Sequence, residues 1–166
     1  MNNTVTYSGY RPGALASVLK LHVDYYHTYW NFGQQFEVKV AGEMAEFLGR
    51  MDQINDLFLS VYSSDGRLLG SITIDASEAD VGGAHLRWFI VSPQSAGQGL
   101  GRKLITRAIN HCDQLNFCRV YLTTFKGLDA ARSLYDSCGF VLEGEKNVDQ
   151  WNGGVIEQKF VRLNPE

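Results

Sequence analysis

The fold of this chain is decided by residues 89–104, which read Phe89-Ile90-Val91-Ser92-Pro93-Gln94-Ser95-Ala96-Gly97-Gln98-Gly99-Leu100-Gly101-Arg102-Lys103-Leu104. An apolar strand pattern ends at Val91, a short loop follows, and an amphipathic helix pattern begins near Gly99. A helix N-terminus exposes unpaired N–H groups and the positive end of the helix dipole, so it attracts anions. Glycines let the backbone approach such an anion without a Cβ in the way. The stretch therefore predicts an anion site between a strand and a helix.

The glycine spacing excludes one common phosphate loop and weakens another. A Walker loop needs GxxxxGK followed by Ser or Thr, but Gly101 is followed by Arg102. A dinucleotide fingerprint needs GxGxxG and a later acidic residue, whereas the spacing here is GxGxG and the next strand ends in Leu122-Thr123-Thr124. A tight turn whose glycines only permit close packing is a structural explanation that the spacing alone leaves open. The cations Arg102 and Lys103 oppose the helix dipole, which favours a bound anion.

Outward from this loop, the apolar patterns predict a mixed α/β sheet protein. Helices are expected from a first turn at Pro12 up to about Trp30, over 40–51, from near Gly99 to 115 and over 129–138, the last capped by Gly139. Strands are expected over 3–10, 57–62, 68–74, 85–91, 119–123, 140–145 and 154–163, the last two around a turn at Asn152-Gly153-Gly154. Strand alternation puts His85, Arg87 and Phe89 on one face. Layer packing then predicts a central sheet covered by helices.

Length and composition predict one globular domain over residues 1–166. The chain is 45% hydrophobic and 20% charged, with a net charge of −3, so a nucleic-acid partner has no electrostatic support. No signal-peptide pattern and no apolar run long enough to cross a bilayer occur, and we expect a cytoplasmic protein without a membrane partner. Three cysteines without CxxC spacing argue against disulfides and a zinc site, so no metal is expected.

Two segments together resemble the GNAT superfamily of N-acetyltransferases. The first is the 89–104 stretch, which resembles the coenzyme A loop of that family. The second is an Ala-x-x-Leu-Tyr-x-x-x-Gly-Phe pattern, matched by Ala131, Leu134, Tyr135, Gly139 and Phe140. Gly9-Tyr10-Arg11-Pro12-Gly13 further resembles acetyltransferase domains fused to regulators of the multiple-antibiotic-resistance (MarR) type. No winged-helix portion is present, so DNA binding is not implied.

The resemblance implies a GNAT fold, with a mostly antiparallel sheet of about seven strands, about four helices and the order β-α-α-β-β-β-α-β-α-β-β. It implies acetyl-CoA as acyl donor, held by Phe89, Ile90, Val91, Gly97, Gln98, Gly99, Leu100, Gly101, Arg102, Lys103 and Thr124. Two positions depart from the family pattern. Ala96 replaces a usual Arg or Gln, and Leu128 stands where many members carry an Asn. Backbone amides and Arg102 are therefore expected to hold the diphosphate.

Acetyl transfer needs a general acid for the departing thiolate, and the resemblance implies Tyr135. A phenol with a pKa of about 10 is protonated at neutral pH and can donate to sulfur. Read from the pattern alone, Tyr135 is equally an apolar-face aromatic beside Leu134 and Cys138. Amides near Phe89–Val91 are expected to stabilise the oxyanion. Cysteine ping-pong chemistry is not favoured, because Cys112 and Cys118 occupy core-like positions and Cys138 ends a helix.

The general base is left with several alternatives. His85 lies near the position where some family members place a catalytic glutamate, and histidine can serve near neutral pH. A lone strand histidine is also often structural. Glu37, Glu78 and Asp80 are further candidates, and a relay through water to solvent without a dedicated base is another.

The acceptor is predicted to be an amine of a small molecule or peptide. The first helix carries His22, Tyr25, Tyr26, Tyr29 and Trp30, which form either a core stripe or an aromatic wall for the amine. Trp151 is either an edge residue or a wall of the same site. A homodimer is possible. The alternatives to an enzyme are a silent coenzyme A sensor and an oligomerising domain that binds no cofactor.

Overall fold

The computed structural model describes residues 4–149 and 154–164. The strands are β1 (Thr6–Ser8), β2 (Leu57–Tyr62), β3 (Leu68–Asp75), β4 (Ala84–Val91), β5 (Arg119–Phe125), β6 (Val141–Val148) and β7 (Val155–Leu163). The helices are α1 (Ala14–Trp30), α2 (Gln34–Arg50), α3 (Leu100–Gln114) and α4 (Asp129–Ser137), with a 3₁₀ turn at Pro93–Ser95. This order confirms the predicted one. Trp151 and the Asn152-Gly153 part of the predicted turn lie outside the described residues.

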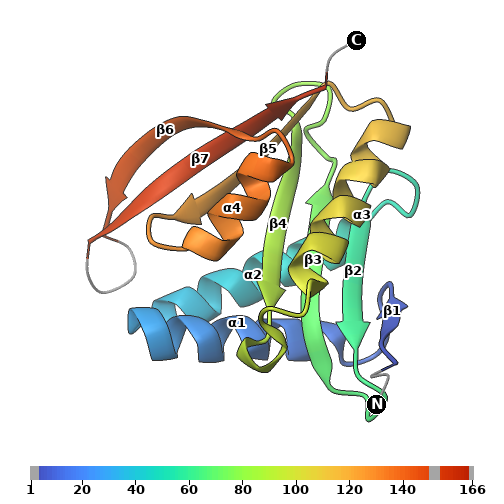
Figure 1. Cartoon of the computed structure of the whole chain (residues 1–166), viewed down its shortest axis with the longest axis vertical. Coiled ribbons are helices and arrows are strands. Elements are labelled where there is room, and N and C mark those ends of the chain that lie inside the picture. The colour runs from blue at the N-terminus through green and yellow to red at the C-terminus, as the bar shows by residue number, and fades with distance from the viewer. Residues whose placement is uncertain (1–3, 150–153, 165–166) are drawn as a thin grey trace.

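The strands form one sheet in the order β1-β2-β3-β4-β5-β7-β6 (Figure 1). Every neighbouring pair is antiparallel except β4 and β5, which are parallel. Parallel neighbours need a crossover connection, and α3 supplies it. The glycine-rich stretch that leads into α3 therefore starts at the carboxyl end of the central strand β4.

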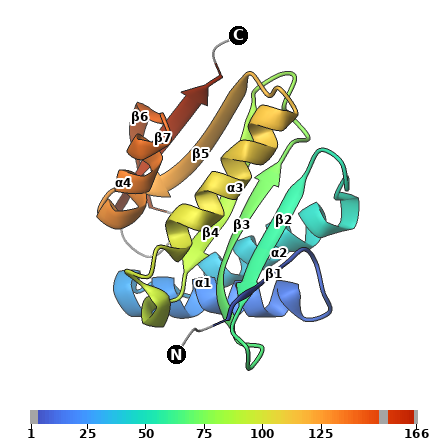
Figure 2. The same ribbon diagram turned by 45° about the vertical axis from the view of Figure 1, so that its right-hand side comes forward.

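The helices cover both faces of the sheet, as Figure 2 shows with α3 in front of the sheet and α1 and α2 behind it. One core lies between the sheet and α3, around Ile72, Leu104 and Ile105, and α4 adds Tyr135 to it. The other core lies under α1 and α2, around Val18, Met44 and Phe47. Apolar positions at helical spacing produce both cores, as the sequence predicts. None of the described helices is long and apolar enough to cross a membrane.

The first helix starts later than its sequence predicts. Pro12 was expected in its first turn, but α1 begins at Ala14, and Gly13 is the cap with φ 88°. The positive φ explains the shift, since glycine adopts a left-handed conformation that a side chain resists. Pro12 therefore lies in the turn before the helix, where the Ala14 N–H donates to the Arg11 carbonyl over 2.9 Å.

The parallel strands β4 and β5 separate soon after they begin. Their register joins only Ala84 to Val120 and His85 to Tyr121. Beyond these residues β5 continues to pair with β7 along its length, up to Phe125. Figure 1 shows β4 and β5 diverging from this shared end. The second half of β4 thus has no described strand beside it on the β5 side, and the sheet opens there.

A bulge at Trp88 changes the faces of β4. The register with β3 shifts between Ser71 and Thr73, and Trp88 has φ 49°, an unusual value for a bulky residue. The hydroxyl of Ser71 donates to the Trp88 carbonyl over 3.1 Å and holds the bulge. Trp88 packs with the α1 and α2 core, while Phe89 packs with the α3 core. The prediction that Phe89 shares a face with His85 and Arg87 is therefore wrong, because the extra residue reverses the alternation.

Candidate active site

The glycine loop, defined as Gly97–Gly101, presents open backbone to solvent. Gly97 and Gly99 have φ values of 77° and 74°, a left-handed conformation that favours glycine. A Cβ built on either residue would meet no atom within 4 Å, so a ligand can approach the backbone closely. Gly99 caps α3, and the first intrahelical bond runs from the Lys103 N–H to the Gly99 carbonyl over 3.1 Å. The N–H groups of the first turn are left for an anion.

Gly101 is needed for a different reason, which is close packing. A Cβ on Gly101 would lie 3.1 Å from Cδ1 of Leu134, 3.5 Å from Cγ2 of Val91 and 3.6 Å from Cζ of Phe89. The absence of a side chain therefore lets α3 start close against β4 and α4. The packing explanation that the spacing left open holds for Gly101, whereas the open backbone of Gly97 and Gly99 fits an anion cradle.

The other predicted residues of this loop divide into core and surface. Ile90 and Leu100 are buried, so only their backbone groups can face a ligand. Gln98 is exposed, and its side-chain amide donates to the Gln94 carbonyl over 3.4 Å. Arg102 and Lys103 are exposed in the first turn of α3. Charged groups there can reach a phosphate in front of the helix.

A cavity of about 440 Å³ lies where β4 and β5 diverge. Its walls take residues from α1, α2, β4, β5, α4, β6 and β7. Phe89, Thr124 and Tyr135 belong to the walls of this cavity. Phe89 connects the cavity to the glycine loop, because it lies against Gly101 on one side and packs its ring 6.0 Å from that of Tyr135. The start of α3 and the cavity are therefore neighbours, with Phe89 in contact with both.

Tyr135 is fixed by its surroundings. It is 4% exposed, and its ring packs against Phe89, Phe140 and Phe160. Burial raises the pKa of its hydroxyl above the ordinary value, so the phenol stays protonated at neutral pH. Tyr135 is therefore both a core residue and part of the cavity wall, so its core position does not exclude a role as general acid.

His85 also lines the cavity, but its surroundings oppose a positive charge. Burial lowers its pKa to about 3, and the nearby Arg87 and Lys159 act in the same direction. The ring stacks on that of Tyr121 with centroids 4.4 Å apart. A base works best with a pKa near the operating pH, so this environment disfavours the predicted role of His85 as general base. Glu37, Glu78 and Asp80, the other predicted bases, do not belong to the described wall of the cavity.

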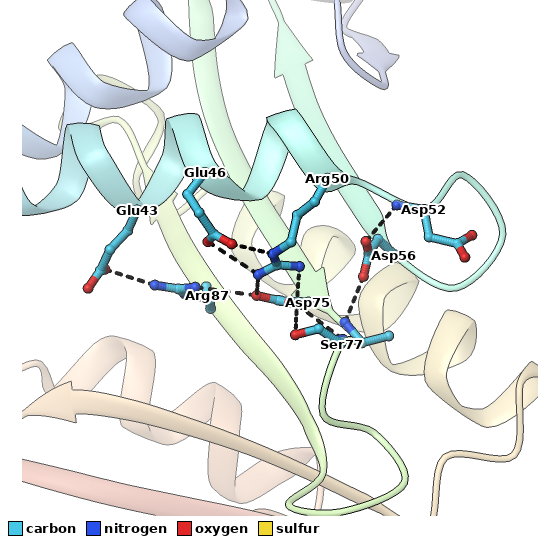
Figure 3. Close-up of polar contacts among 9 residues, drawn as sticks. Glu43, Glu46, Arg50, Asp52, Asp56, Asp75, Ser77 and Arg87 are labelled. Carbon is cyan, nitrogen blue, oxygen red and sulfur yellow. Dashed lines mark hydrogen bonds and ion pairs between the residues drawn. The ribbon is translucent and has the colours of Figure 1, made fainter.

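A polar cluster ties α2 to the sheet beside the cavity (Figure 3). Asp75, at the end of β3, accepts hydrogen bonds from Arg50 over 3.0 and 2.7 Å and from the Ser77 hydroxyl over 2.8 Å. Burial alone would raise the pKa of Asp75, but these hydrogen bonds outweigh it and hold the pKa below its usual range. Arg87 lies 3.3 Å from Asp75 and 2.8 Å from Glu43, and so bridges β3 and α2.

Sequence reasoning missed the charged wall of the cavity. Glu43 and Lys39 come from α2, Lys146 from β6 and Glu157 from β7. Lys39 lies 3.3 Å from Glu43, and Lys146 lies 3.3 Å from Glu157. A signal for Glu43 existed, because it stands between Val40 and Met44 on the edge of the apolar stripe of α2. Lys146 and Glu157 carried no comparable signal in the sequence.

The aromatic helix α1 contributes two residues to the cavity, His22 and Tyr26. Trp30 instead packs on Phe125 and on Phe32, with centroids 5.7 and 6.1 Å apart. Tyr29 is 60% exposed. The predicted stripe thus divides into core, surface and cavity positions. Cys112 is buried, which raises its pKa to about 12, so it is not an activated nucleophile.

The sequence that builds this site matches a family model. The model described as the Acetyltransferase (GNAT) family matches residues 15–140, more than half of the chain. The chain belongs to this family. The predicted membership of this acetyltransferase family is thereby confirmed. No group of three or more His, Cys, Asp or Glu side chains in the described part of the chain could hold a metal ion.

Similar proteins agree with this assignment. Mycothiol acetyltransferase of Kocuria rhizophila is 44% identical over 50 residues, which are 30% of this chain and 16% of that protein. The chain thus matches only a small part of this curated relative. The structure of yncA from Salmonella typhimurium with its cofactor acetyl-CoA is 16% identical with a TM-score of 0.75, over 98% of this chain and 95% of the other. Spermidine N-acetyltransferase from Vibrio cholerae, solved with CoA and spermine, is 23% identical with a TM-score of 0.69, over 96% and 95%. Because the identities to both solved structures are low, these similarities show a shared fold and no more.

Proposed function

We propose that this chain transfers the acetyl group of acetyl-CoA directly to the primary amine of a small molecule. The observation that carries the proposal is that the glycine loop and the cavity are neighbours, with Phe89 between them and Tyr135 packed beside Phe89. Acetyl-CoA bound there supplies an activated acyl carbon. One structural neighbour described above, the spermidine N-acetyltransferase from Vibrio cholerae, was solved with a small amine, which supports the same class of acceptor.

The residues of the loop divide the binding of the donor between backbone and side chains. N–H groups of Gly97 to Gly101 face the diphosphate, and Arg102 and Lys103 add positive charge beside it. The carbon chain of the donor lies along Phe89, Ile90 and Val91, whose strand lacks a partner on the β5 side. Backbone N–H groups of this strand stabilise the oxygen of the reacting thioester.

Tyr135 acts as the general acid. Its hydroxyl is protonated at neutral pH, because burial raises its pKa, and it gives that proton to the departing sulfur. The nitrogen–carbon bond forms, the carbon–sulfur bond breaks, and the proton of the amine leaves to solvent. We assign His85 no role in the proton transfer, since burial lowers its pKa to about 3. Thr124 contributes its hydroxyl to the cavity wall beside the donor.

The charges of the cavity favour an acceptor with one amino group over a polyamine. Its walls hold Lys39, Arg87 and Lys146 against Glu43 and Glu157, so there is no excess of negative charge. Repulsion from these cations opposes a ligand with several ammonium groups. The proposal therefore distinguishes this chain from the Vibrio cholerae protein, which was solved with spermine.

A release assay tests the proposal. The purified chain is mixed with acetyl-CoA and with single amines from four classes: amino acids, arylalkylamines, polyamines and short peptides. Free thiol is followed, and the product is identified by the mass of one added acetyl group. We expect turnover with a monoamine and little with spermidine. Acetyl-CoA binding without turnover on any class would instead favour the silent sensor, which nothing in the relatives supports.

The thermal midpoint separates these outcomes from a chain that binds no donor. Acetyl-CoA at 100 times its dissociation constant adds about 2.7 kcal/mol to the free energy of unfolding. A midpoint that does not rise would leave the oligomerising domain as the explanation. A raised midpoint together with acetylated product supports the enzyme.

A further inference from the structure

His22 is a buried histidine on α1 that this mechanism does not use. It is 4% exposed, and its Nδ1 lies 2.8 Å from the carbonyl oxygen of Val18, one helical turn earlier. A carbonyl oxygen can only accept, so Nδ1 carries the ring proton and donates it. Nε2 is then the unprotonated nitrogen, and its lone pair has no hydrogen-bond partner among the described residues.

The position of the ring leaves this lone pair to a ligand. His22 belongs to the wall of the cavity, together with Tyr26, Trp88 and Tyr135. Nδ1 is turned back to the backbone of its own helix, and the ring stacks on Tyr26 with centroids 6.5 Å apart and planes at 15°. The opposite nitrogen is therefore the polar atom that this ring can offer to the cavity. Nε2 is not among the fully buried polar atoms that lack a partner, so a donor in the cavity can reach it.

The protonation state suits an amine. Burial lowers the pKa of His22 to about 4, although the bond to Val18 acts in the opposite direction. The ring is neutral at physiological pH and places no positive charge against an ammonium group or an amine. The cations of the wall, Lys39, Arg87 and Lys146, cannot serve this purpose.

We propose that Nε2 of His22 accepts a hydrogen bond from the amine nitrogen of the acceptor and holds that nitrogen in the cavity. The inference rests on the proposed acetyl transfer, because it names a contact of the acceptor in that reaction. His22 binds and positions the amine and takes no proton from it. His22 therefore binds the amine through a hydrogen bond, without the negative charge that would attract a polyamine.

Two variants test this role by separating the two nitrogens of the ring. His22→Asn places an amide near the position of Nδ1 and can keep the bond to Val18, but it leaves nothing at Nε2. His22→Gln places an amide near the position of Nε2. We expect His22→Asn to raise the KM for the best amine about tenfold or more, with kcat and the affinity for acetyl-CoA little changed. His22→Gln should restore most of the lost affinity.

A second measurement does not depend on turnover. Two-bond ¹H–¹⁵N spectra of the imidazoles show which nitrogen carries the proton. We expect the Nδ1–H form for His22, and a shift of its Nε2 resonance when the amine is added. An Nε2–H form, or an unchanged resonance with saturating amine, overturns the inference, as does an unchanged amine KM in a folded His22→Asn variant. In each of these cases acetylation by the unaltered chain would stand, whereas the failure of the proposed function would appear first, as no product from the unaltered chain.

Discussion

The glycine loop and the cavity lie on either side of Phe89 and differ in what they present to a ligand. The loop offers backbone N–H groups at the start of α3, and its glycines keep side chains away. The cavity offers side chains from seven elements, among them the buried His22, the partly buried His85 and paired charges. Backbone groups suit a ligand that all members of a family share, whereas side chains can be changed to suit one acceptor. The difference assigns donor binding to the loop and acceptor choice to the cavity.

Tyr135 stands between the two regions, and its hydroxyl should show the largest effect. We expect Tyr135→Phe to lower kcat about 100-fold or more, because the departing sulfur loses its proton donor. The phenylalanine fills the same space between Phe89, Phe140 and Phe160, so the thermal midpoint and the affinity for acetyl-CoA should change little. Steady-state kinetics with a fixed amine measures the effect.

Tyr26→Phe is the matched control, since Tyr26 lines the same cavity and belongs to α1. Its kcat should stay close to that of the unaltered chain. If Tyr135→Phe kept full turnover while the chemical step limited the rate, the general acid would lie elsewhere. Equal losses in both variants would show that the cavity needs hydroxyl groups as such, and the proposed division would fail.

The polar cluster of Asp75 supports the cavity alone, so its removal should separate the two regions. We expect Asp75→Asn to lower the free energy of unfolding by about 3 kcal/mol, because Arg50 and Arg87 lose a buried partner. The KM for the amine should rise as Arg87 loses one of its two anchors. The affinity for acetyl-CoA should not change.

Urea unfolding and a binding titration measure these changes. Glu46→Gln is the control, because Glu46 also accepts from Arg50 but is exposed, and such a pair contributes about 0.5 kcal/mol. A loss of acetyl-CoA affinity in Asp75→Asn would show that the cluster supports both regions. That result would contradict the separation.

The two cavity histidines predict how stability depends on pH. The folded-state pKa values of His22 and His85, about 4 and about 3, lie below the unfolded value of about 6.5. The unfolded chain therefore binds more protons, and stability falls as pH falls below about 6.5. The slope that each histidine contributes should rise from about 0.7 kcal/mol per pH unit at about pH 6.5 to about 1.4 near pH 5, and it should fade only as the pH approaches the folded-state pKa.

Urea unfolding over this range measures the slope, and His22→Asn should reduce it by about half. The glycine loop contains no such group, so acetyl-CoA binding should not share this dependence. An unchanged slope in His22→Asn would mean that the folded chain protonates His22 as readily as the unfolded chain does. The neutral ring assigned to the cavity would then be wrong.

The same contrast explains how much the sequence could predict. The order of elements and the loop could be predicted because apolar periodicity and glycine spacing are local signals. The bulge at Trp88 could not, since its φ of 49° comes from the pairing with β3. Glu157 could not be placed in the site either, because the sequence of β7 alone does not show which strands and helices pack around it. His22 was predicted as part of a core stripe or an aromatic wall, and its Nδ1 bond separates it from the rest of that stripe.

The smallest effect is expected from a side chain of the loop itself. If backbone N–H groups carry most of the donor binding, Arg102→Ala should weaken acetyl-CoA binding only about threefold, as the loss of one exposed charge near a helix end. Calorimetric titration at low and high salt measures the affinity, and the difference should shrink at high salt. Arg107→Ala is the control, because Arg107 lies further along α3 over the ring of Tyr7. A loss above about tenfold would show that Arg102 replaces the polar side chain missing at Ala96, and that the loop, like the cavity, binds through side chains.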